Sequence, residues 1–204
     1  MSRKCAWMTT MVVLAAALSL TACAKPPQVE VEGVAAALTR AESAEAATYA
    51  ADELEQAREA QRAAAAEIDA QGQKFALVRS YDHALELLQA ANEAAAAAEQ
   101  AAAAGRARVK ADAEAAVAAI GESLTAVDAD LAALTTCRRK PKGFAQDLEL
   151  LNGRTEALRA QLGAVQAEID SARFMAAIEM AGALETEVSA LATDLTGART
   201  KLGC

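Results

Sequence analysis

The chain has 204 residues, with 28 acidic against 20 basic side chains and a net charge of −8 at neutral pH. This balance argues against a nucleic-acid-binding protein, because contacts to phosphates need a basic face. Aromatic residues make up only 3% of the chain and proline contributes three residues. Alanine and other strong helix formers dominate, which predicts an all-α protein with closely packed helices.

Residues 1–22 have the pattern of a secretory signal peptide. Arg3 and Lys4 form a basic start, and residues 8–22 carry no charge. This uncharged segment is too short for a permanent membrane-spanning helix. Cleavage after residue 22 would remove these two basic residues and no acidic one, so the net charge would become −10.

The segment Leu20-Thr21-Ala22-Cys23 resembles the lipobox of bacterial lipoproteins. The resemblance implies that Cys23 carries a diacylglycerol and becomes the first mature residue. Two acyl chains, at about 0.8 kcal/mol per buried methylene, would anchor the chain stably. Because Ala24 follows Cys23, the resemblance implies the periplasmic face of the outer membrane, or the cell membrane if the source is not Gram-negative. The alternative is a secreted protein cleaved after an A-x-A-type site, with Cys23 free.

After a short tether, residues 23–29, an N-terminal helical region is expected over residues 30–136. Its first apolar stripe consists of Val31, Val34, Leu38, Ala41 and Ala44. Thr48 as a cap, with Asp52 and Glu53 in a first turn, predicts a kink or a restart. The next stretch is expected to end at Gly72 as a C-cap.

A regular apolar pattern begins at Leu77. Its members are separated by threes and fours: Leu77, Tyr81, Ala84, Leu88, Ala91, Ala95, Ala98, Ala102, Gly105, Val109, Ala113, Ala116, Ile120, Leu124, Val127, Leu131 and Leu134. This spacing is typical of a coiled-coil seam and predicts one helix of about 60 residues. A break at Gly105 is the alternative, but one glycine costs only about 1 kcal/mol relative to alanine.

Residues 137–143 are expected to form a basic loop, because proline and glycine follow a run of cations there. Two further stripes are of nearly equal length. The first consists of Phe144, Leu148, Leu151, Thr155, Leu158, Leu162, Val165 and Ile169. The second consists of Phe174, Ile178, Ala181, Leu184, Val188, Leu191, Leu195, Ala198 and Leu202. Residues 144–204 should therefore form an antiparallel αα-hairpin that turns near Asp170.

The fold class predicted from these elements is an elongated antiparallel helical bundle or coiled coil with one long central helix. A weak internal repeat pairs AEIDAQGQKF (66–75) with AEIDSARF (167–174), and ALE follows nine residues after each phenylalanine. This repeat is consistent with duplication of a hairpin unit, although such matches also arise by chance in low-complexity sequences.

The segments TYAADELEQAREA (48–60) and KFALVRSYDHALELLQAANEAA (74–95) resemble an alanine-rich helical lipoprotein domain of unknown function. In some bacterial proteins that domain precedes a peptidoglycan-binding OmpA-type domain. The resemblance covers residues 30–100 approximately. Because the family has no assigned activity, the resemblance implies a location and a helical fold and no reaction.

If Cys23 is acylated, Cys137 and Cys204 are the two cysteines left in the mature chain. Cys137 precedes the predicted hairpin and Cys204 follows it, so an antiparallel arrangement brings them to the same end. In an oxidising periplasm this predicts a disulfide worth about 4 kcal/mol. The alternatives are a free redox pair and intermolecular disulfides.

No catalytic or metal-binding motif stands out in the sequence. His83 is the single histidine, and without ligand partners it is expected to be a surface or capping residue. The acidic residues lie among arginines at helical spacing, which is typical of a solvated face. We therefore expect no catalytic residue, no metal and no cofactor.

The basic loop contains the one concentrated positive charge, formed by Arg138, Arg139, Lys140 and Lys142. An exposed loop is the simple interpretation. If residues 30–71 led away from the membrane and the long helix returned, the loop would come close to the lipid. There each cation would contribute about 1 kcal/mol.

The function expected from these observations is non-enzymatic. The protein would be a spacer or adaptor of the cell envelope, held by its lipid and meeting an envelope protein partner. The alternative is a chaperone-like module with a tetratricopeptide-like groove, because SYDHALELLQAANEAA (80–95) resembles one helix of such a repeat. Those arrays need about three or more units, and two are visible.

Overall fold

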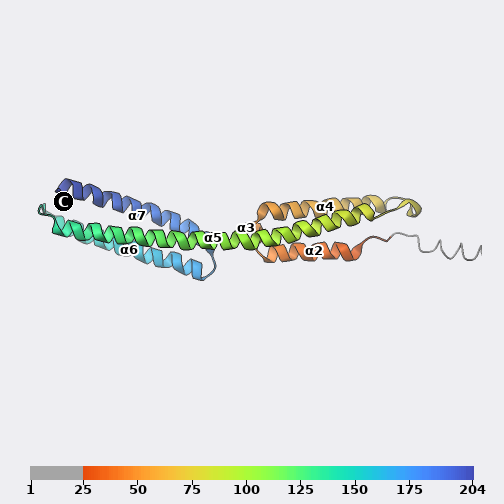
Figure 1. Cartoon of the computed structure of the whole chain (residues 1–204), viewed down its shortest axis with the longest axis horizontal. Helices are drawn as coiled ribbons and strands as arrows, with labels where there is room; N and C mark the ends of the chain where they lie inside the picture. The colour runs from red at the N-terminus through yellow and green to blue at the C-terminus, as the bar shows by residue number, and fades with distance from the viewer. Residues whose placement is uncertain (1–24) are drawn as a thin grey trace, which may run out of the picture. The chain divides into compact units, whose positions relative to one another are not determined.

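The computed structural model describes residues 25–204, and every regular element within this range is helical (Figure 1). In chain order these elements are α2 (Gln28–Ser43), α3 (Ala46–Tyr49), α4 (Ala51–Gly72), the 3-10 turn η2 (Ala76–Val78), α5 (Asp82–Thr136), α6 (Phe144–Asp170) and α7 (Phe174–Leu202). The predicted all-α class is confirmed. The expected signal peptide and Cys23 lie outside the described residues.

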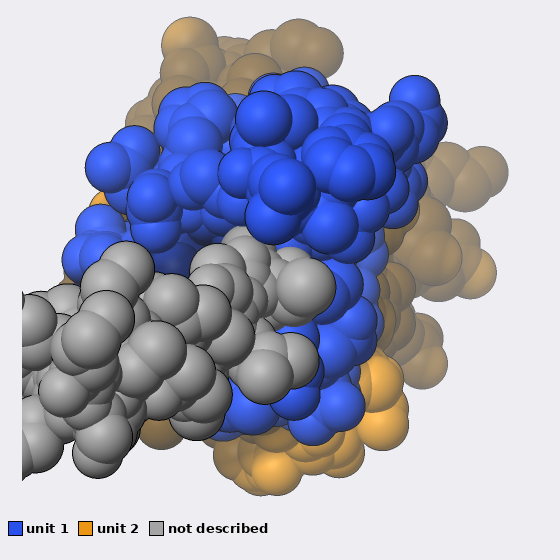
Figure 2. Space-filling model, turned by 90° about the vertical axis from the view of Figure 1, so that its right-hand side faces the viewer, with its two compact units in different colours: residues 1–104 blue, residues 105–204 orange. Residues whose placement is uncertain are grey.

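The chain divides into two compact units, coloured separately in Figure 2. Unit 1 ends at Ala104 and unit 2 begins at Gly105. The boundary therefore falls inside α5, whereas the sequence placed a division at the basic loop, residues 137–143. That loop does separate two helices, because α5 ends at Thr136 and α6 begins at Phe144.

The long helix α5 is continuous through Gly105 for 55 residues, as the seam predicted. Its seam residues are buried from Tyr81, which is 5% exposed, to Leu134, which is 2% exposed. The exceptions within this stretch are Gly105, Val109 and Ala116, which are half-buried. The predicted first member is wrong: Leu77 lies in η2, before the helix, and is 77% exposed.

In unit 1 the chain reverses direction between α2 and α4. Glu45, with φ of 63°, ends the α2 segment in a left-handed conformation, and the four-residue α3 forms the turn. The interhelical ion pair between Arg58 and Glu42, at 2.6 Å, joins α4 back to α2. A restart was predicted at this place, but Thr48 lies inside α3 and is not its cap. The restart is a complete hairpin turn and not a kink.

The ends of the unit 1 helices also differ in detail from expectation. The helix α2 begins at Gln28, so the last two residues of the expected tether, Gln28 and Val29, are helical. Pro27 immediately precedes α2, and its carbonyl accepts a hydrogen bond from the Val31 N–H at 3.1 Å. Gly72 is the last residue of α4 and Gln73 caps it in a right-handed conformation, so Gly72 is not the predicted C-cap.

The core of unit 1 is built mainly from alanine. Its buried residues are Val34, Ala37, Leu38, Ala41, Ala46, Ala50, Leu54, Ala57, Ala64, Leu88, Ala91, Ala95, Ala98 and Ala102. Small side chains allow helix backbones to approach closely, but each alanine buries less apolar surface than a leucine does. Unit 1 therefore gains less hydrophobic stabilisation per buried residue than a leucine-rich bundle of the same size.

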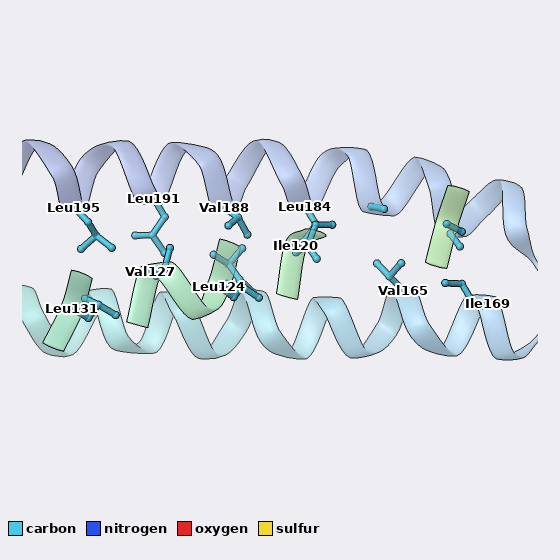
Figure 3. Close-up of a cluster of buried hydrophobic side chains, with 14 of the residues drawn as sticks. Ile120, Leu124, Val127, Leu131, Val165, Ile169, Leu184, Val188, Leu191 and Leu195 are labelled. Carbon is cyan, nitrogen blue, oxygen red and sulfur yellow. The ribbon is translucent and has the colours of Figure 1, made fainter. Parts of the chain in front are cut away.

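Unit 2 is a three-helix bundle made by the second half of α5 with α6 and α7. Figure 3 shows larger aliphatic side chains from the three helices meeting between them: Ile120, Leu124, Val127, Leu131, Val165, Ile169, Leu184, Val188, Leu191 and Leu195. Thr155, the polar member of its stripe, is 1% exposed, and its hydroxyl donates to the Leu151 carbonyl at 3.0 Å. Its polar group is therefore satisfied within α6.

The predicted antiparallel hairpin of α6 and α7 is confirmed, and residues 171–173 connect the two helices. Ala172 adopts a left-handed conformation with φ of 59°. Arg173 then closes the turn, because its backbone N–H donates to the Glu168 carbonyl at 2.9 Å and its guanidinium donates to the Glu168 carboxylate.

The two copies of the weak repeat adopt different structures. Phe174 begins α7 and is buried at 7% exposure, whereas Phe75 lies in the loop before α5 and is 72% exposed. Ala84 is buried, but the corresponding Ala183 faces solvent. The residues that the two copies share therefore do not occupy structurally equivalent positions.

Candidate functional site

The disulfide end of unit 2 combines the features of the molecule that most resemble a binding site. At this end α5 terminates, the basic loop turns the chain, α6 begins and α7 ends. Six residues at this end were expected from the sequence to matter chemically. They are the four loop cations Arg138, Arg139, Lys140 and Lys142, and the cysteines Cys137 and Cys204. The structure brings them to one place.

The structure pairs Cys137 with Cys204, as the hairpin argument predicted, with 5.5 Å between the two Cα atoms. That distance is in the ordinary range for a disulfide. Cys137 follows the last turn of α5 and is 3% exposed. Gly203, with φ of 71°, ends α7 in the left-handed conformation, and the N–H groups of Gly203 and Cys204 both donate to the Arg199 carbonyl. This cap directs the final cysteine back toward α5.

An apolar pocket of about 300 Å³ lies beside the disulfide. It is lined by Leu134 of α5, Pro141 of the loop, Phe144, Asp147, Leu148 and Leu151 of α6, and Ala198, Lys201 and Leu202 of α7. Seven of these side chains are apolar, and Asp147 and Lys201 supply the charged groups. The pocket exists because three helices end at the same level and their last apolar residues have no further turn to cover them.

The basic loop borders this pocket. Arg138, Arg139, Lys140 and Lys142 are all exposed to solvent. The Lys140 ammonium lies 6.0 Å from the centre of the Phe144 ring, which is a pocket residue. The loop enters α6 through Gly143, whose φ of 90° lies in the left-handed region that favours glycine. The site therefore combines an apolar cavity with a cationic border.

A membrane-surface role for these four cations remains a prediction. That role assumed that residues 30–71 lead away from the membrane and that the long helix returns. This assumption is wrong, because residues 30–71 do not run in one direction. They reverse direction between α2 and α4, so α5 is not the first return of the chain. The structure instead places the cations beside an apolar pocket, which the sequence pattern did not predict.

Ion pairs between helices hold unit 2 around this end. Arg199 of α7 pairs with Asp130 of α5. Two residues earlier on α5, Asp128 pairs with Arg159 of α6. Arg154 of α6 pairs with Asp194 of α7 at 3.4 Å. These bridges link all three helices, although as partly exposed pairs each contributes at most about 1 kcal/mol.

The remaining candidates belong to unit 1. His83 occupies the first turn of α5, and its exposed ring lies 3.3 Å from the Glu86 carboxylate. The acidic residues of α4 form the solvated face that was expected, with Glu55 3.9 Å from Arg58 and 2.5 Å from Arg62. Within residues 25–204, no three histidine, cysteine or acidic side chains cluster as metal ligands.

The pocket was not predicted from the sequence, because the terminal residues of the stripes have the same spacing as ordinary core residues. A signal was present: Phe144, Leu148 and Leu151 begin a stripe directly after a loop containing Pro141. At the end of a bundle such residues have helices on their sides but none beyond them. Whether they close over one another depends on helix lengths, and periodicity along one helix does not contain that information.

Comparison of the chain with protein-family models, with curated proteins and with solved structures gave no match. Among residues 25–204, no helix combines the length and apolar character needed to cross a bilayer.

Proposed function

We propose that the protein is a lipid-anchored component of the bacterial cell envelope that acts as a non-enzymatic spacer or adaptor. The anchor would be a diacylglycerol on Cys23, at the periplasmic face of the outer membrane, or in the cell membrane if the source is not Gram-negative. The lipobox-like segment supports the anchor. The burial of the helical stripes within each unit supports a structural role, since the charged faces are left for solvent.

The observation that carries the adaptor role is the apolar pocket at the disulfide end of unit 2. A volume of about 300 Å³ is at the lower end for ligand pockets and suits one or two apolar side chains of a partner. The neighbouring Arg138, Arg139, Lys140 and Lys142 would attract acidic residues that flank those side chains. The partner expected is therefore an envelope protein with an apolar anchor residue in an acidic segment.

A photo-crosslinking amino acid incorporated at position 148 tests this role in intact cells. Leu148 lines the pocket. Leu150 is the matched control, because it lies on the same helix, outside the pocket, and is 74% exposed. We expect one dominant, identifiable envelope protein captured from position 148, and a strong reduction when the four loop cations are changed to Gln. Equal capture from both positions would contradict a partner site at the pocket.

A chaperone-like module is the second candidate, and the apolar lining of the same pocket favours it. A chaperone would give many crosslinked products from position 148, whereas an adaptor would give one. The pocket is small for an extended peptide, and the two repeat copies are not equivalent, so the adaptor is the better-supported proposal.

The anchor is tested separately by changing Cys23→Ser. We expect the wild-type chain to incorporate a palmitate analogue and to fractionate with membranes, and the variant to lose both properties. A wild-type protein whose mature N-terminus carries an unmodified Cys23 would rule out the proposed anchor.

A further inference from the structure

The loop between α4 and α5, residues 73–81, displays three large apolar side chains to solvent. Phe75 is 72%, Leu77 is 77% and Val78 is 69% exposed. Single exposed apolar residues are common on protein surfaces. A cluster of them in one loop indicates a surface that contacts a membrane or another protein. The turn η2, which holds two of the three, contains no buried residue.

The backbone of this loop is braced by hydrogen bonds. The Arg79 guanidinium donates to the carbonyls of Gly72 and Lys74, at 2.8 Å each. The Ser80 N–H donates to the Gln71 side-chain carbonyl at 3.4 Å, and the Val78 N–H donates to the Phe75 carbonyl at 3.0 Å. The loop therefore holds its apolar side chains outward in a defined conformation, so little conformational entropy would be lost on contact.

The position of the loop within unit 1 connects it with the anchor. Figure 1 shows the start of α2, the end of α4 and the loop at the same end of unit 1, and Figure 2 looks onto that end. Val29, in the first turn of α2, is also 78% exposed. Four residues, 24–27, separate Cys23 from α2. An extended chain spans at most about 3.6 Å per residue, so a lipid on Cys23 would keep this end close to the bilayer.

The charges of the loop suit a lipid surface. Residues 73–81 contain Lys74 and Arg79 and no acidic residue, in a chain with a net charge of −8. Segments that combine apolar side chains with cations bind at the boundary between lipid headgroups and acyl chains. Each cation near an anionic surface contributes about 1 kcal/mol to the binding free energy.

From this arrangement we propose that loop 73–81 is a membrane-contact element that inserts Phe75, Leu77 and Val78 into the interfacial region of the bilayer. The proposal rests on the proposed function, because the lipid on Cys23 brings the loop to the surface. The anchor and the loop together form a two-point attachment. This attachment sets the orientation of unit 1 relative to the membrane, which a single point of attachment does not do.

A tryptophan reporter tests the proposal directly. The chain has a single tryptophan, Trp7, within the expected signal peptide. In a Trp7→Phe background, Phe75→Trp places the one fluorophore in the loop. Leu150→Trp is the matched control, because Leu150 is an exposed apolar residue of unit 2 with nearly the same exposure as Phe75. Both proteins are purified full length in lipidated form and reconstituted into vesicles of phosphatidylethanolamine and phosphatidylglycerol.

We expect the Phe75→Trp protein to show a blue-shifted emission in vesicles and strong quenching when the lipid acyl chains are brominated. The Leu150→Trp protein should show neither change. Adding Leu77→Ser and Val78→Ser to the Phe75→Trp protein should reduce the quenching. Helix content measured by circular dichroism should stay unchanged, because all three side chains are exposed.

Emission from position 75 that brominated lipid does not quench, in a protein whose lipidation is verified by mass spectrometry, would overturn the loop proposal and leave the anchor intact. A blue shift in native envelopes without quenching in vesicles would assign the loop to a protein partner and would also overturn it. If mass spectrometry finds Cys23 unmodified, the anchor fails. Quenching of the unmodified protein on added vesicles would then still support membrane contact by the loop, and its absence would refute that contact.

Discussion

At the scale of single residues, the connection between α6 and α7 contains an ion pair between Glu168 and Arg173. The hydrogen bond from Arg173 lowers the pKa of the Glu168 carboxyl, and the same bond raises the pKa of the Arg173 guanidinium. A carboxyl with a lowered folded-state pKa adds stability above its ordinary pKa. That contribution is lost as the pH falls through the lowered value.

We therefore predict that Glu168→Gln lowers the melting temperature of unit 2 slightly at pH 7, and that the difference from wild type shrinks as the pH falls from 7 to below the ordinary pKa of a glutamate. Thermal unfolding across this range measures the effect. Glu156→Gln, an exposed change on the same helix, is the control and should behave like wild type at each pH. A difference that persists at low pH would show that the carboxylate charge is not the cause.

Replacing glycine by alanine should have opposite effects on stability at two positions of unit 2. Gly121 lies inside α5, and a Cβ built there would meet no atom within 4 Å. Gly143 also has open space, but its φ of 90° is strained for any other residue. We predict that Gly121→Ala stabilises unit 2 by about 0.4–1 kcal/mol and that Gly143→Ala destabilises it. Chemical denaturation measures both. Stabilisation by Gly143→Ala would contradict the left-handed turn into α6.

At the scale of helices, the stability of unit 2 comes from the seam that α5, α6 and α7 share. Leu191 of α7 is fully buried at 0% exposure, whereas Leu150 of α6 is 74% exposed. We predict that Leu191→Ala destabilises unit 2 by about 2–5 kcal/mol, because it removes buried apolar surface and leaves a cavity. Leu150→Ala should change the stability by less than about 0.5 kcal/mol. Equal effects in urea denaturation would contradict this packing of α7.

At the scale of the whole chain, two cores of different composition share the continuous helix α5. Unit 1 buries mainly alanine, while unit 2 buries mainly leucine, valine and isoleucine and contains the disulfide. We predict two thermal transitions, with unit 2 melting at the higher temperature. Reduction of the disulfide should shift only the upper one, at a cost of about 4 kcal/mol for a loop of this length. Hydrogen exchange assigns the transitions to residues, and a shift of the lower one on reduction would contradict this assignment.

The sequence by itself determined the helical class, the continuity of α5, the residues that form its seam and the hairpin that brings Cys137 to Cys204. These features follow from the spacing of apolar residues, because residues three and four apart lie on the same face of a helix. Local capping was less predictable. Thr48 and Gly72 have the residue types of caps, but Thr48 lies inside α3 and Gln73 caps α4.

Only the tertiary structure decided where the ends of the helices leave apolar groups uncovered. Leu77 continues the spacing of the seam, yet it lies outside the helix and points to solvent, because α5 begins five residues later. Phe144 and Leu148 follow an equally regular stripe, yet they line a pocket, because three helices end at one level beside the disulfide. Apolar spacing reports which face of a helix is buried. It does not report how far the neighbouring helices extend, and that length decides whether the last residues of a stripe become core, a pocket or an exposed tip.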